Sequence, residues 1–306
     1  MSNTLQATGS TPERILTRLE WRVIKRLDGL LQGDYRTLYY GTGIDFADLR
    51  EYQAQDDIRH IDWNVTARMD SPYVRQYVED REITAWFLLD LSPSMNFGPI
   101  DRPKALVLTD FVATLARLLT RDGNRVGAIL YNSKVERTIP PLSGRNQVLR
   151  LIRDLQREAE TGNHAGSHTG TELGMLLQAG LNTFRRRSLI FVISDFISEP
   201  GWERPLALLA QRHELVAIRL WDPRETELPD AGLIVVEDAE TGEHLYVDTS
   251  DAGFRQRFQA VAEEREAALA QSIKRSGVDF ISISNEEDLS EAIVRMVSLR
   301  KRRRAV

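Results

Sequence analysis

Two runs of the chain are apolar on both faces, and they constrain the fold more than any other feature of the sequence. The segments 83–90 (ITAWFLLD) and 188–195 (SLIFVISD) carry hydrophobic side chains at consecutive rather than alternate positions. Such strands are typical of a parallel sheet that is covered by helices on both sides. Each run ends in an aspartate, Asp90 in the first and Asp195 in the second.

The rest of the chain alternates between strand and helix patterns. Further strands are predicted at 73–78, 125–133, 215–222 and 278–284, with a short one in VERTIP, and amphipathic helices at 102–124, 145–160, 171–184 and 251–277. This order predicts an α/β fold with a doubly wound, mostly parallel, Rossmann-like sheet. Residues 233–248 have the pattern of a hairpin inserted between the fifth and sixth strands.

Composition excludes several classes of protein. The 306 residues include no cysteine, which rules out disulfides, thiolate metal sites and a cysteine nucleophile. The net charge of -5 does not favour nucleic-acid binding. We find neither a signal-peptide pattern nor a run of about 18 apolar residues, so we expect a cytoplasmic protein without a transmembrane segment.

A helix is predicted to begin after Thr11, with Pro12 in its first turn. Its apolar positions at helical spacing are Ile15, Leu19, Val23, Leu27 and Leu30, and a basic row on another face consists of Arg14, Arg18, Arg22 and Arg26. The helix either packs on its own domain with a solvated cationic face, or lies on an anionic membrane or in a partner groove. The arginine-rich tail, LRKRRRAV, is either a solvated end or a contact for a polyanion.

Oxygen-bearing side chains follow both apolar strands. Asp90, Ser92 and Ser94 alternate in LLDLSPSM, Thr171 stands at the start of a predicted helix, and Asp195 ends the second strand. Ligands of doubly wound sheets bind outside the carboxyl ends of the strands, so these groups are expected to meet there. Such hard oxygen donors suit Mg²⁺ best, with Mn²⁺ or Ca²⁺ as alternatives. His164 and His168 lie in the loop before Thr171. They are either solvated or available as a base or a ligand for a softer metal.

These five residues, in this order, resemble the metal-ion-dependent adhesion site of von Willebrand factor A domains. The resemblance covers about residues 82–306. It implies that Ser92 and Ser94 ligate the ion directly, that Thr171 does so directly or through water, and that Asp90 and Asp195 act largely through water. It also implies that the ion grips an acidic side chain of a protein partner.

The segment 41–63, GTGIDFADLREYQAQDDIRHIDW, resembles the signature of the domain of unknown function 58 family, as does the later DPRE at 222–225. Members join this segment to an A domain and often accompany MoxR-type AAA+ ATPases. Two regions are therefore expected: residues 1–81, with the first helix and the signature, and residues 82–306, the A-like domain. Many relatives carry membrane spans before the signature. This chain shows none there, so membrane residence is not carried over.

The favoured function is a metal-dependent protein-interaction module that assists a MoxR-type ATPase or recognises its client. The alternative is a metal-dependent phosphohydrolase that uses the same ion. No P-loop, HExxH, GxSxG or second carboxylate cluster is found, and we assign no catalytic or organic-cofactor residue. The acids of the signature segment, interleaved with Arg50 and Arg59, form either a recognition surface or an internal ion-pair network that locks the segment onto the A-like domain.

Overall fold

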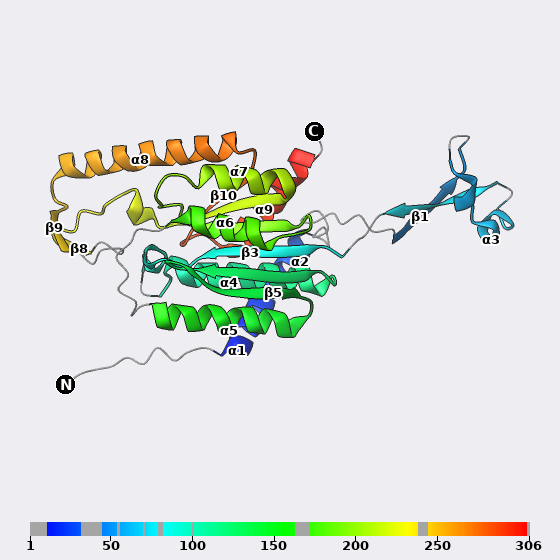
Figure 1. Ribbon diagram of the computed structural model, residues 1–306, viewed down its shortest axis with the longest axis horizontal. Coiled ribbons are helices and arrows are strands. Elements are labelled where there is room, and N and C mark those ends of the chain that lie inside the picture. Colours follow the sequence, from blue (N-terminus) through cyan, green and yellow to red (C-terminus); the bar gives the residue numbers. More distant parts are fainter. Residues whose placement is uncertain are drawn as a thin grey trace.

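A six-stranded sheet forms the centre of the molecule (Figure 1). The computed structural model describes residues 11–31, 45–53, 56–69, 71–78, 82–99, 101–162, 172–237 and 244–304. The strand order is β10-β7-β6-β3-β4-β5. The strands are β3 (Thr84–Asp90), β4 (Arg125–Tyr131), β5 (Val135–Leu142), β6 (Leu189–Ser194), β7 (Glu214–Trp221) and β10 (Asp279–Ser284). Neighbouring strands are parallel, except that the edge strand β5 is antiparallel to β4, so the predicted doubly wound, mostly parallel sheet is confirmed.

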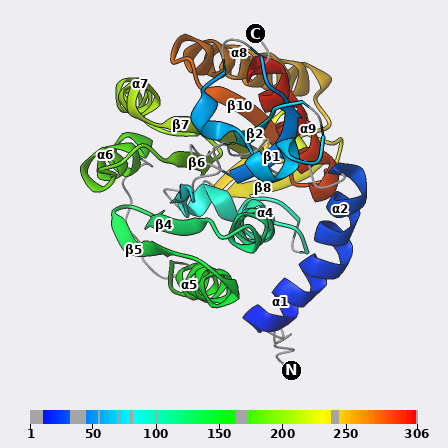
Figure 2. The same ribbon diagram turned by 90° about the vertical axis from the view of Figure 1, so that its right-hand side faces the viewer.

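Helices cover both faces of this sheet. They are α1 (Pro12–Leu19), α2 (Lys25–Leu31), α4 (Lys104–Arg121), α5 (Arg145–Gly162), α6 (Leu173–Thr183), α7 (Glu203–Arg212), α8 (Ala252–Arg275) and α9 (Leu289–Arg304). Figure 2 shows α6 and α7 on one side of the sheet and α2, α4 and α9 on the other. Side chains of β3 alternate between two hydrophobic clusters: Phe87 joins the α4 side, and Leu88 joins the α6 side. Strands that feed two cores in this way are apolar at every position.

The N-terminal helix is packed on its own domain, which decides between the alternatives left by the sequence. Its buried apolar residues belong to the same cluster as those of α4, α5 and α9. Arg18 of its basic row forms an ion pair of 2.6 Å with Asp110 of α4, and Arg26 forms one of 2.9 Å with Asp288 before α9. Arg18 and Arg26 therefore fasten the helix to the domain.

One detail of that helix corrects the expected helical face. Leu30 was expected to face inward but is 54% exposed, and Leu31 is buried instead. The cause is a π-helical turn, η1 (Glu20–Ile24), between α1 and α2. A π turn holds more residues than an α turn, so it rotates the following residues and moves the buried position along the chain.

The segment between α2 and β3 holds a strand that the sequence pattern did not reveal. β1 (Asp45–Glu51) pairs with β2 (Tyr73–Val78) in an antiparallel hairpin, with an irregularity between Phe46 and Asp48. Two short helices lie between them, η3 (Ile58–His60) and α3 (Trp63–Thr66). Acids in β1 and the interrupted register hid the period-2 pattern of a strand. Figure 1 shows this hairpin at the opposite end of the molecule from β8 (Leu233–Glu237) and β9 (His244–Asp248), which form the predicted hairpin.

The C-terminal tail also differs from a frayed end. Helix α9 continues to Arg304, and Arg300 is buried, with its guanidinium 2.8 Å from a carboxylate oxygen of Glu214. None of the helices in the described ranges is long and apolar enough to cross a membrane.

Candidate metal centre

The two strand-end aspartates leave neighbouring strands at the same edge of the sheet. β3 and β6 are parallel and in register, with Leu89 opposite Ile193. Asp90 is the last residue of β3, and Asp195 directly follows β6. Both carboxylates are buried, and each is close enough to the other for its charge to act on it. The structure therefore brings together the two acids that lie far apart in the sequence.

The serines of the DLSPS segment complete one side of this centre. The Asp90 carboxylate accepts a hydrogen bond of 3.0 Å from the backbone N–H of Ser92. A 3-10 turn, η4 (Pro93–Asn96), then brings the hydroxyl of Ser94 to 3.1 Å from that of Ser92. Both serines are buried. The hydroxyls of Ser92 and Ser94 thus lie next to each other beside the buried carboxylate of Asp90.

Asp90 carries an uncompensated charge. It is 0% exposed, and in the described chain no lysine, arginine or histidine lies within ion-pair distance of it. Its other oxygen accepts a hydrogen bond of 2.6 Å from the hydroxyl of Ser194, a residue that the sequence reading did not single out. Burial and the negative charge of Asp195 raise the pKa of Asp90 to about 6. A buried carboxylate without a counter-ion is costly, and a bound cation would remove that cost.

Asp195 is held by a different set of partners. One carboxylate oxygen accepts a hydrogen bond of 3.0 Å from the N–H of Ile197, and the other lies 2.8 Å from the ammonium of Lys104. The next residue, Phe196, has a φ of 59°, in the left-handed region that non-glycine residues seldom adopt. Strained backbone of this kind persists where the surroundings impose it, and it clusters at functional sites.

Lys104 is the residue at this centre that sequence reasoning missed. Its side chain is 0% exposed, and its ammonium lies 2.5 Å from Glu225 as well as 2.8 Å from Asp195. A signal was present in the sequence: Lys104 is spaced with Leu108 and Phe111 at i, i+4 and i+7, on the buried face of α4. A lysine at the start of an amphipathic helix is ordinarily read as a surface residue, and its partners lie 91 and 121 positions away.

A second acidic group lies at the same edge, after β7. Asp222 is buried and accepts hydrogen bonds from the side chain and backbone N–H of Arg224 and, at 2.5 Å, from the side-chain amide of Asn285. Gly98, in the loop after η4, packs against both Asp222 and Asn285, with a φ of +130°. The Asp222 carboxylate of the DPRE segment therefore already has hydrogen-bond and ion-pair partners within the chain.

The remaining predictions concern Thr171, the two loop histidines and the charged residues of the signature segment. Thr171, His164 and His168 lie outside the described residues, so their roles stay predictions. In the described part of the signature segment, Arg50 pairs with Asp56 and Arg59 with Asp57, so these two ion pairs join residues within the segment rather than the segment to the A-like domain. In the described ranges no group of three or more histidine, cysteine or acidic side chains could hold a metal. The donor set of Asp90, Asp195, Ser92 and Ser94 contains only two acids and still fits one hard divalent cation, because hydroxyls supply the remaining oxygens.

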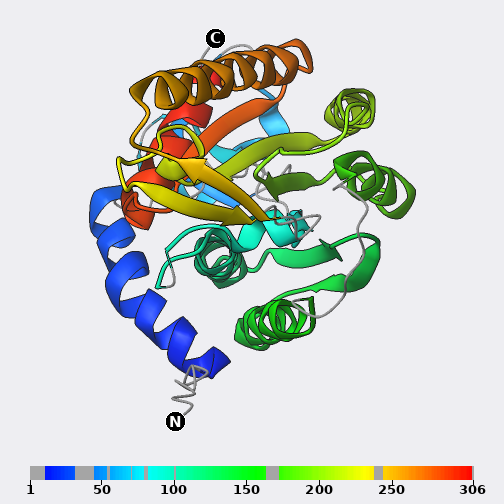
Figure 3. The same cartoon turned by 90° about the vertical axis from the view of Figure 1, so that its left-hand side faces the viewer.

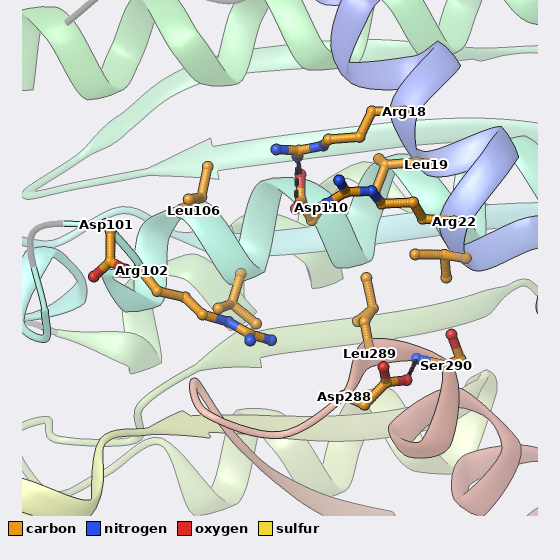
Figure 4. A pocket seen from close by; sticks show the side chains of 12 residues that line it. Arg18, Leu19, Arg22, Asp101, Arg102, Leu106, Asp110, Asp288, Leu289 and Ser290 are labelled. Atoms are coloured by element: carbon orange, nitrogen blue, oxygen red, sulfur yellow. Dashed lines mark hydrogen bonds and ion pairs between the residues drawn. The ribbon is translucent and has the colours of Figure 1, made fainter.

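A cavity of about 340 Å³ lies elsewhere, between α1 and η1, α4 and the start of α9 (Figure 4). Arg18 crosses it to bind both carboxylate oxygens of Asp110, at 2.6 and 2.7 Å. Asp288 accepts the backbone N–H of Ser290 at 2.8 Å. None of the predicted ligands lines this cavity, and its ion pairs belong to the attachment of the N-terminal helix.

The six-stranded, mostly parallel sheet with helices on both faces defines the class of fold, a doubly wound α/β domain. The chain belongs to the family described as "Protein of unknown function DUF58", whose model matches residues 48–268. It is 35% identical to the uncharacterized protein Mb1516 of Mycobacterium bovis, over 94% of this chain and 89% of that one. The uncharacterized protein Rv1480 of Mycobacterium tuberculosis matches with the same identity and coverage. Among solved structures, the conserved hypothetical protein BatB from Bacteroides thetaiotaomicron matches 72% of this chain and 99% of its own, with 16% identity and a TM-score of 0.47.

Proposed function

We propose that this chain is a protein-interaction module that binds its partner through a divalent cation. The ion is Mg²⁺, with Mn²⁺ or Ca²⁺ as alternatives, held by Ser92, Ser94, Asp90 and Asp195, with Thr171 as a further ligand. The observation that carries this proposal is the uncompensated charge of Asp90, buried beside a second carboxylate and two serine hydroxyls. When bound, the ion supplies a Lewis-acidic position that accepts a further oxygen ligand.

The partner would present a carboxylate. A divalent cation with few charged ligands attracts an anionic oxygen, whereas a lysine or arginine side chain is repelled. Family membership supports a MoxR-type AAA+ ATPase, or the client of one, as the source of this acid, and such a partner would place the protein in the cytoplasm. Inside the chain, Asp90 and Asp195 hold the ion, and the hydrogen bond from Ser194 to Asp90 fixes one carboxylate orientation.

The signature segment is proposed as a second contact that selects the ATPase. In its described part, Ile58 is 64% exposed and Trp63 is 69% exposed. Large exposed apolar side chains close together in the chain are typical of interaction surfaces. Arg50 is paired with Asp56 and is about one-third exposed, whereas Arg59 is 84% exposed beside Asp57, so the exposed surface of the segment combines these two apolar side chains with a charged one.

Thermal unfolding with Mg²⁺ and with EDTA tests the cation site. Wild-type protein should be stabilised by Mg²⁺, by about 2.7 kcal/mol when the ion is at 100 times its Kd. Ser92→Ala should lose this response. Ser188→Ala is the matched control, because Ser188 is also buried but precedes β6 at the other edge of the sheet. Equal Mg²⁺ responses in Ser92→Ala and wild type would overturn the site.

Titration of the ATPase or client in Mg²⁺ and in EDTA tests the mode of binding. Affinity should require both Mg²⁺ and Asp90, and it should fall when one acid of the partner is changed to its amide. Trp63→Ser should weaken binding to the ATPase without changing the Mg²⁺ response. Equal affinity in the two buffers would show that partner binding does not use the ion.

A further inference from the structure

Lys104 is a fully buried cation placed between two acids from different parts of the chain. Its ammonium lies 2.8 Å from a carboxylate oxygen of Asp195 and 2.5 Å from one of Glu225. Asp195 is a candidate ligand of the cation centre, and Glu225 stands in the turn η5 (Pro223–Glu225) after β7. The lysine therefore joins the metal centre to a second loop at the same edge of the sheet.

The position of this lysine is unfavourable unless it has an electrostatic role. Lys104 is the first residue of α4, where the helix dipole disfavours a positive charge. Removing an ammonium from water adds a further cost, which only close opposite charges offset. Asp195 and Glu225 supply those charges, and replacing all three groups by apolar residues would often be equally stable. The arrangement is thus poorly explained by stability alone.

The ammonium of Lys104 interacts with both Asp195 and Glu225, and Glu225 has a further cation nearby. Glu225 is itself near a second cation, with its other oxygen 4.0 Å from the guanidinium of Arg219. Arg219 is in turn paired with Glu266 of α8 and donates to the backbone carbonyl of Asp195. Glu225 therefore competes with Asp195 for the charge of Lys104, and Arg219 limits how strongly it competes.

We propose that Lys104 is a positioning residue that sets the charge of the divalent-cation centre, and that Glu225 adjusts its effect. This inference rests on the proposed function. One oxygen of Asp195 is committed to the ammonium and the other to the N–H of Ile197, so Asp195 neutralises only part of the ion's charge. Asp90 is then the main anionic donor of the chain. The bound ion then keeps part of its positive charge. This charge favours the binding of a carboxylate from the partner, whereas a site that neutralised the ion fully would not attract one.

Two variants test this inference because it predicts opposite effects on Mg²⁺ affinity. In Glu225→Gln, the ammonium acts on Asp195 alone, so the Kd for Mg²⁺ should rise severalfold. In the double variant Lys104→Met/Glu225→Gln, Asp195 is released and the Kd should fall at least about tenfold. Calorimetric titration with Mg²⁺ alone measures both, without any partner. Circular dichroism first establishes that each variant is folded.

The outcomes separate this inference from the proposed function. If wild-type protein binds no Mg²⁺, the proposed function fails and the inference fails with it. If wild type binds Mg²⁺ and both variants bind it equally well or with changes in the same direction, Lys104 is only structural and the inference alone is overturned. If the double variant does not fold, Glu225→Gln decides: an unchanged or lower Kd for Mg²⁺ contradicts the inference.

Discussion

Asp90 and Asp222 have the same place in the fold and the same burial, but they differ in how their negative charges are compensated. Each stands at the carboxyl end of a strand at the same edge of one sheet, and each is 0% exposed. Asp222 has the Arg224 guanidinium at 3.0 Å and the Asn285 amide at 2.5 Å. Asp90 has a serine hydroxyl and a backbone N–H, and a second acid as its charged neighbour.

This difference teaches how to distinguish a structural acid from a functional one. Burial alone does not separate them, and neither does position in the fold. A buried carboxylate with its own guanidinium and amide contributes to folding, whereas one that is left with neutral donors is stable only at a cost. On this criterion Asp222 holds loops together, whereas Asp90 fits the ligand role proposed above.

The largest expected effect comes from removing the structural acid. Asp222→Ala leaves the buried amide of Asn285 and the guanidinium of Arg224 without their shared partner, so unfolding free energy should fall by about 3–4 kcal/mol. Urea denaturation in EDTA measures this loss. Asp222→Asn retains an acceptor and should lose less. The stabilisation by Mg²⁺ should persist in both variants. Its disappearance in folded Asp222→Ala would mean that the two acids form one site.

Removing the charge of Asp90 should have the opposite sign. Its pKa of about 6, against an ordinary value of 3.8, corresponds to a destabilisation of about 3 kcal/mol at neutral pH. Asp90→Asn should therefore raise the unfolding free energy in EDTA by up to about 2–3 kcal/mol, while abolishing the Mg²⁺ response. The exposed Asp248→Asn is the control and should stay within about 0.5 kcal/mol of wild type. A destabilised Asp90→Asn would show that the charge is already compensated.

The pH dependence of the unfolding free energy tests the same charge on Asp90, because the wild type changes this charge by titration and the Asp90→Asn variant cannot. The folded-state pKa of Asp90 is raised above the unfolded one, so the folded state binds the proton more tightly. Stability from this group is greatest below about pH 4, falls by up to about 2–3 kcal/mol between pH 4 and 6, and then levels off. Denaturation midpoints in EDTA across this range should decline less in Asp90→Asn than in wild type. Parallel profiles would refute the assignment, since other acids contribute equally to both proteins.

The smallest expected effect comes from the contact between Gly98, in the loop after η4, and the side chains of Asp222 and Asn285. An added Cβ at Gly98 would lie 2.8 Å from the amide nitrogen of Asn285 and 3.2 Å from Asp222, at a φ of +130°. Gly98→Ala should lower the unfolding free energy by about 1–2 kcal/mol. Gly123→Ala is a matched control, because Gly123 also has a positive φ but nothing within 4 Å of an added Cβ. Equal losses in the two variants would mean that the packing of the loop on Asp222 contributes little.

Much of the sheet could be predicted because fully apolar strands and amphipathic helices leave strong local patterns. The strand-end acids could be placed at one edge for the same reason, since parallel strands end together. Lys104 was not recognised as a site residue, because its partners come from distant segments and a lysine at the start of an amphipathic helix is ordinarily read as a surface residue, although its spacing places it on the buried face. The exposed Leu30 shows a second limit: a single π turn is not encoded in hydrophobic periodicity. The division of the chain at residue 81 stays a prediction, although α1 and α2 pack with α4 in one cluster.

The β1–β2 hairpin is joined to the rest of the chain at both ends, after α2 and immediately before β3. Its attachment is therefore at the amino end of β3, while Asp90 stands at the carboxyl end of that strand. Seven residues of strand separate the two points, a length of roughly 23 Å at about 3.3 Å per residue. A short peptide motif of three or four residues cannot reach from one to the other. A partner that contacts both the signature segment and the proposed cation must span at least this distance.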